Sequence, residues 1–214
     1  MKHGLAVARD ANDPLRCALA LEQIGRVYLH QKQYTDAREI FTVGTLTAER
    51  AHSGEAEAML LSGQARTYAE TKQPLRALDC MTRAEEALTQ PTETTLPEPR
   101  TFNQARLTSD YGRLYATLTS HDTRFVDQAI TTLTASTTPS NTLHVKRLVF
   151  RLTELAAAHL YGGDRETGIH IGHQVMDMAA HMRSERLAEH LKILRAAVHV
   201  QVAGSDITEL ATRL

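Results

Sequence analysis

The sequence predicts an all-α protein, a solenoid of about four helix hairpins followed by C-terminal capping helices. Small and aromatic residues with the spacing of a helix hairpin occur at Gly25, Tyr28, Ala37 and Phe41. Forty residues later, the same spacings of three, nine and four return at Ala65, Tyr68, Ala77 and Met81. Aromatic residues make up only 5% of the 214 residues, and tryptophan is absent, which suits helix packing better than a β-sandwich or barrel. We expect one domain over residues 1–214.

The first hairpin is expected over residues 14–54, after a lone N-terminal helix at 5–12. Asn12-Asp13-Pro14 ends that lone helix, and proline suits the first turn of the helix that follows. The first hairpin helix should run from Pro14 to His30. Thr35 should begin the second helix, which ends near residue 54.

The second hairpin is expected over residues 55–90, with Gln73-Pro74 at its internal turn, where proline can open a helix. Residues 90–100 follow with the sequence QPTETTLPEPR, which has three prolines and no helical periodicity. This connection is longer than connections between helices usually are. We expect an insertion on the surface; a lid or a binding arm is the alternative.

Two further hairpins are expected at 101–138 and 142–182, and capping helices at 184–214. In the third hairpin, Gly112 and Tyr115 repeat the offset of three, and residues 120–122 lengthen the turn. The fourth hairpin is degenerate at the positions of the signature glycine and tyrosine. Ser184 is a suitable N-cap for the first capping helix, which should extend to about Val202.

These signature positions resemble those of the tetratricopeptide repeat, a helix hairpin of about 34 residues. The resemblance covers residues 14–182, and the forty-residue spacing of the first two copies departs from the family pattern. It implies a right-handed superhelix in which the first helix of each hairpin lines a concave groove. It also implies that the residue after the signature glycine points into that groove.

The residues after the signature position are arginine in the first three hairpins, at Arg26, Arg66 and Arg113. A guanidinium is a planar fork that grips carboxylates through two hydrogen bonds, so a groove for an acidic segment or a C-terminal carboxylate is expected. The alternative is that each arginine pairs with a nearby glutamate, such as Glu22 or Glu70, or is solvated. Flanking groove positions are mixed and often small, at Glu22, Leu29, His30, Met59, Ser62, Ala69, Ser109 and Ala116.

A narrower resemblance covers Gly162 to Val198. This segment is similar to the C-terminal end of actinobacterial regulators in which a helix-turn-helix domain precedes tetratricopeptide repeats. The similarity includes the turn Met182-Arg183-Ser184-Glu185-Arg186 and the basic, leucine-rich helix after it. It implies a sensor or interaction half without its own DNA-binding domain.

Several other classes of function lack support. The formal net charge is −1, from 24 basic and 25 acidic residues, so no general attraction to nucleic acid or to an anionic membrane is expected. No apolar run approaches the ~20 residues of a membrane helix. Cys17 and Cys80 are expected to be small buried side chains, and His170 and His173 lack a third ligand at zinc spacing. We therefore expect no catalytic site, metal or cofactor, and a cytoplasmic location.

The sequence thus predicts a non-catalytic module that binds a peptide or protein segment in bacterial regulation. One alternative is a self-associating scaffold, a homodimer, because the lone N-terminal helix leaves an unmatched apolar end at Leu5. Another is a sensor for a small signalling molecule held in a closed apolar cavity between helices.

Overall fold

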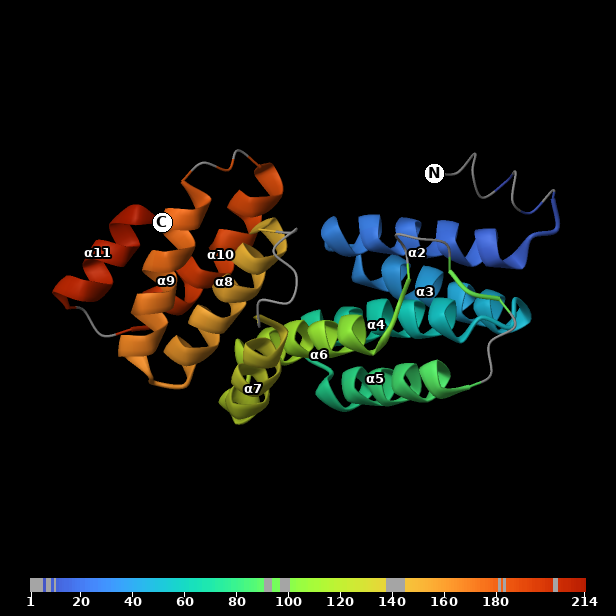
Figure 1. The fold of residues 1–214 in the computed structure, drawn as a ribbon, viewed down its shortest axis with the longest axis horizontal. Coiled ribbons are helices and arrows are strands. Elements are labelled where there is room, and N and C mark those ends of the chain that lie inside the picture. The colour runs from blue at the N-terminus through green and yellow to red at the C-terminus, as the bar shows by residue number, and fades with distance from the viewer. Residues whose placement is uncertain are drawn as a thin grey trace. The chain divides into compact units, whose positions relative to one another are not determined.

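The computed structural model describes residues 6, 9, 11–90, 94–96, 101–137, 145–180, 182, 184–201 and 204–214. Ten α-helices and no strand occur in these residues, so the all-α prediction is confirmed (Figure 1). The chain divides into two compact units, residues 1–110 and 111–214, which are described one at a time. No helix among the described residues is long and apolar enough to cross a membrane. Leu5 and most of the expected helix at 5–12 lie outside the described residues.

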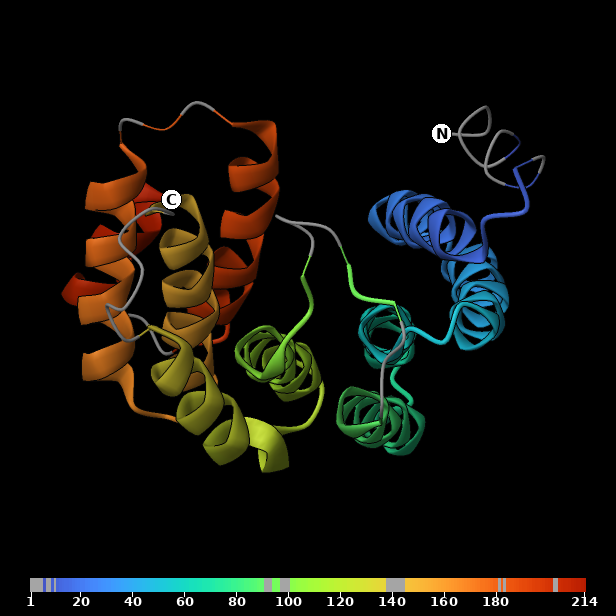
Figure 2. The ribbon, with the colours of Figure 1, turned by 45° about the vertical axis from the view of Figure 1, so that its right-hand side comes forward.

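Four helices of nearly equal length form most of the first unit. They are α2 (Pro14–His30), α3 (Tyr34–Arg50), α4 (Gly54–Glu70) and α5 (Pro74–Thr89). The first three have 17 residues and the fourth has 16, and three-residue linkers make each helix begin 20 positions after the previous one. Consecutive helices pack against each other, and Figure 2 shows them nearly end on. Two helices and two linkers account for the forty-residue spacing in the sequence.

Each linker of this unit closes the preceding helix in the same way. The middle linker residues Lys32, His52 and Lys72 have φ of 58°, 49° and 59°. In each linker the next N–H donates back to a carbonyl of the last helical turn, from Gln33 to Tyr28, from Ser53 to Ala48 and from Gln73 to Tyr68. This is the Schellman arrangement, in which one left-handed residue reverses the chain. Because the linkers are equal, α2 and α4 run parallel and lie side by side.

The core of the first unit is centred on the ring of Phe41 from α3. Phe41 is completely buried, and a Cβ added to Gly25 of α2 would lie 2.6 Å from its ring. A Cβ added to Gly63 of α4 would lie 2.5 Å from the same ring. Phe41 therefore wedges between two glycines and joins three helices. The sequence pattern predicted the role of Gly25 and the small residue Ala65 at the equivalent position, which is completely buried. It did not single out Gly63, whose contact with Phe41 joins the two hairpins.

The connection after α5 is partly held against α4. Its residue Leu96 is 4% exposed, and its N–H donates to the Glu55 carboxylate over 3.2 Å. Phe102, just before α6 (Gln104–Thr119), is also buried. The prediction of a surface insertion is therefore wrong for Leu96. The helix expected to start near Phe102 begins two residues later.

The second unit contains the end of α6 and five further α-helices. The element order is η1 (Thr123–Phe125), α7 (Val126–Thr137), α8 (Val145–Tyr161), α9 (Arg165–Ala179), α10 (Glu185–His199) and α11 (Ser205–Arg213). The 3-10 turn η1 lies between α6 and α7, in the turn that residues 120–122 were predicted to lengthen. Helix α8 packs against α7, α9 and α10, and ten of its 17 residues are buried.

The expected capping helices α10 and α11 continue the packing pattern of the hairpins. The Lys146 ammonium donates to the Ser184 hydroxyl near the start of α8 and α10, over 2.9 Å. Near their ends, the Gln201 amide donates to the Leu160 carbonyl over 3.0 Å. The two helices are therefore parallel, as α2 and α4 are, and α11 packs on α9 and α10. Helix α10 ends at His199, three residues before the expected end.

Replacing Gly63 with alanine should destabilise the chain even though alanine is the better helix former by about 1 kcal/mol. The added methyl group would meet the rigid, enclosed ring of Phe41, and overpacking of this kind costs about 1–3 kcal/mol. We expect Gly63→Ala to lower the free energy of urea unfolding by about 1 kcal/mol, measured by circular dichroism. In a Phe41→Leu background the same substitution should instead be neutral or stabilising. Equal effects of Gly63→Ala in the two backgrounds would contradict the wedge.

Candidate functional site

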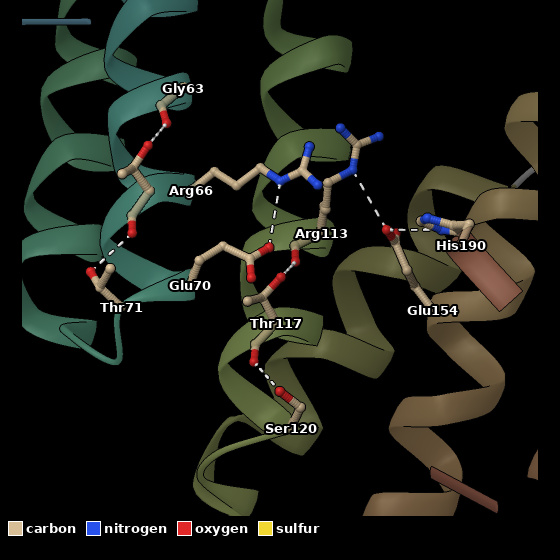
Figure 3. A network of polar contacts seen from close by, with 10 residues as sticks. Gly63, Arg66, Glu70, Thr71, Arg113, Thr117, Ser120, Glu154 and His190 are labelled. Carbon is tan, nitrogen blue, oxygen red and sulfur yellow. Dashed lines mark hydrogen bonds and ion pairs between the residues drawn. The ribbon is translucent and has the colours of Figure 1, made fainter. Parts of the chain in front are cut away.

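Arg26 and Arg66 occupy equivalent places on the adjacent parallel helices α2 and α4. Their side chains are 42% and 30% exposed. Arg26 Nη1 lies 3.4 Å from Glu22 Oε1, and Arg66 Nε lies 4.0 Å from Glu70 Oε1 (Figure 3 shows the second pair). The pairing with Glu22 and Glu70 that was the alternative expectation is thus present. Exposed pairs of this i, i+4 type contribute only about 0.3–0.5 kcal/mol, so Arg66 could exchange Glu70 for a ligand carboxylate at little cost. The Glu22 side chain is only 9% exposed, so Arg26 also compensates a buried carboxylate.

Arg113 belongs to the second unit and has a different environment. Its Nε lies 3.5 Å from Glu154 Oε1 of α8, whose side chain is 4% exposed. The same oxygen lies 3.3 Å from Nε2 of His190 (Figure 3). This nitrogen also lies 3.0 Å from the Phe150 carbonyl oxygen. A buried carboxylate is costly unless charged and polar groups compensate it. Arg113 therefore stabilises a buried charge, a role that sequence reasoning missed because Glu154 is 41 residues downstream in an alanine-rich helix.

The remaining groove candidates follow one face of α4 or lie near it. Glu55, Met59, Ser62 and Arg66 have spacings of four, three and four, which place them on one side of a helix; we call them the α4 stripe. Met59 and Ser62 are 6% and 7% exposed. The Ser62 hydroxyl donates to Asp110 of α6 over 2.8 Å, and Glu55 accepts the N–H of Leu96. The chain's own connection and α6 therefore cover part of the stripe.

The other three candidates differ in exposure. Glu22 is 7% exposed, Ser109 is half-buried, and His30 at the end of α2 is exposed. Arg26, Glu22 and His30 have spacings of four and four, which keep them near one side of α2. The candidates of the first unit thus belong to the two parallel helices α2 and α4 and to α6, whereas Arg113 belongs to the second unit.

The histidines of α9 lie beside charged residues of α9 and α11. Nδ1 of His173 lies 2.8 Å from Nη1 of Arg213, and Nη2 of the same arginine pairs with Asp177. His170 and His173 line a cavity of about 840 Å³ with Arg165 and Asp206, which pair with each other. This cavity is open to solvent, unlike the closed apolar cavity expected for a small-molecule sensor. Within the described residues, no three His, Cys, Asp or Glu side chains are grouped to hold a metal ion.

Comparison with models of known protein families finds no match, and comparison with functionally characterised proteins finds no relative.

Replacing Arg113 with methionine should destabilise the second unit, because Glu154 would lose a compensating charge at a buried site. A loss of about 2–3 kcal/mol in the free energy of urea unfolding is expected. Glu154→Gln in the same chain should recover most of this loss. The matched control Arg16→Met breaks an exposed pair with Asp13 and should change stability by less than about 0.5 kcal/mol. Equal effects of the two arginine substitutions would contradict the structural role of Arg113.

Cys80 should be unreactive in the folded chain. It is buried, and this burial raises the pKa of its thiol to about 11. At pH 8 only about one molecule in a thousand would carry the reactive thiolate. We expect a disulfide reagent such as Ellman's to modify the half-buried Cys17 first and Cys80 only after addition of denaturant. A Cys17→Ser variant that reacts in native buffer at the rate of a free thiol would contradict this expectation.

Proposed function

We propose that this chain is a non-catalytic helical-repeat protein of the tetratricopeptide type that binds an acidic peptide or protein segment on the face formed by α2 and α4. The support is architectural. Two helix hairpins repeat every 40 residues, their first helices are parallel neighbours, and Phe41 joins them through Gly25 and Gly63. Repeats of this kind place equivalent side chains in a row along the first helices.

The equivalence of Arg26 and Arg66 carries the proposal. Both arginines are part-exposed, and both are held by a glutamate of their own helix at long distance. A ligand carboxylate could form a shorter, two-pronged contact with either guanidinium. For Arg66 the exchange would cost little, because an exposed pair within one helix is weak. Arg26 is 42% exposed and could contact a ligand through its other N–H groups while it keeps Glu22. Two such contacts on neighbouring helices would favour a segment with two carboxylates over a segment with one.

Regulation is the setting we propose for this binding. The segment from Gly162 to Val198 resembles the C-terminal end of bacterial regulators that combine a DNA-binding domain with tetratricopeptide repeats. In such an arrangement the repeat region binds a signalling peptide or a protein partner. This binding then controls an output domain on the same chain or on another chain. The resemblance is the basis for this setting, and the α2/α4 face is the basis for the binding.

A library of displayed 12-residue peptides selected on the wild-type chain tests the proposal. We expect the enriched peptides to contain Asp or Glu at two positions. Their affinity should fall at least tenfold on a chain with Arg26→Glu and Arg66→Glu, because two attractive charges become repulsive. The matched control is Arg83→Glu on α5, an exposed arginine of the same unit, which should leave the affinity unchanged. Peptides without acidic residues, or equal loss with the control variant, would contradict the proposal.

A further inference from the structure

We infer that residues 94–96, in the connection between α5 and α6, are a built-in occupant of the α4 stripe, and that a partner segment binds by displacing Leu96. The inference rests on the proposed function and adds to it a chemical class of partner and an autoinhibitory contact. The partner would be an extended segment that presents a leucine and a free backbone N–H next to acidic residues.

The first observation is the burial of a single residue within the connection. Leu96 is 4% exposed, whereas its neighbour Thr95 is exposed and Thr94 is half-buried. A surface insertion has no need to bury a leucine, and loops normally keep their backbone groups in contact with water. Leu96 is therefore the anchor of the described part of the connection.

The second observation is the partner of the Leu96 backbone. Its N–H donates to Oε2 of Glu55 over 3.2 Å. Glu55 is the first member of the α4 stripe, and Met59, the next member, is only 6% exposed. A hydrogen bond from a backbone N–H to a carboxylate depends on no particular side chain of the donor, so a segment from another protein could make it equally well.

The third observation is the chemistry of the connection itself. Its sequence TETTLPE places glutamates three residues before and two residues after Leu96. An acidic segment with a leucine anchor has the composition that the arginines of α2 and α4 would select in a ligand. The chain therefore carries, in cis, a segment of the class that the proposed face would bind in trans.

A tethered occupant competes at a high effective concentration, which is in the millimolar range for short flexible links. A free segment of equal intrinsic affinity would bind only when the tethered one leaves. Its apparent affinity is reduced by the fraction of time for which the stripe is occupied. Weakening the Leu96 anchor should therefore raise the affinity for a free segment without any change in the stripe itself.

The test uses a fluorescent peptide with the sequence of residues 90–101 and three forms of the full chain. Leu96→Asp removes the anchor, and Thr95→Asp is the matched control, because it adds the same charge at an exposed neighbour. We expect the peptide to bind the Leu96→Asp chain at least tenfold more tightly than the wild-type or Thr95→Asp chain, measured by fluorescence anisotropy. A peptide that itself carries Leu96→Asp should bind none of the three chains.

Equal binding of the peptide to all three chains, or to none of them, would overturn the inference. Failure of the proposed function looks different, since the selected library peptides would then be insensitive to Arg26→Glu and Arg66→Glu. Circular dichroism shows whether the Leu96→Asp chain is folded. If it is not, Leu96→Ala replaces it, and the expected gain in affinity over the wild-type chain is at least threefold.

Discussion

The contact of one aromatic ring with two glycines is the constraint on which the first unit depends. Phe41 has no space except where Gly25 and Gly63 lack a side chain. The ring thereby sets the close approach of α2, α3 and α4, and so fixes α2 and α4 as neighbours. Every property proposed for the α2/α4 face depends on that approach, since Arg26 and Arg66 could not act on one ligand from distant helices.

The linkers provide the second constraint, because they set the length of the repeat. Each uses three residues, with a left-handed residue in the middle. A left-handed conformation costs about 1–2 kcal/mol for residues other than glycine. Lysine and histidine accept this conformation because the hydrogen bonds of the Schellman arrangement close the helix. The result is a hairpin of 40 residues whose two ends are built alike, which explains why the copies fall at that spacing.

Local patterns in the sequence were sufficient to predict the helices. They could not predict contacts between residues that lie far apart in the chain. The bounds of α2, the late start after residues 120–122 and the role of Gly25 follow from spacing and turn residues within one hairpin. Gly63 was missed because its contact with Phe41 joins two hairpins, and the spacing within one hairpin does not report it. The Glu154 partner of Arg113 and the burial of Leu96 depend on residues about 40 positions apart, and no periodicity within a helix reports such a pairing. The three arginines looked alike in sequence and differ in structure for the same reason.

That difference has a consequence for how the two units can change over evolution. Position 113 depends on position 154, because loss of the arginine leaves the buried Glu154 carboxylate with less compensation. A change at position 113 is therefore tolerated best together with a change at position 154. Position 66 carries no such obligation, since its partner Glu70 is 30% exposed. The first unit can therefore acquire a new preference by single substitutions, while the second keeps its charge pair as an inherited fixture of its core.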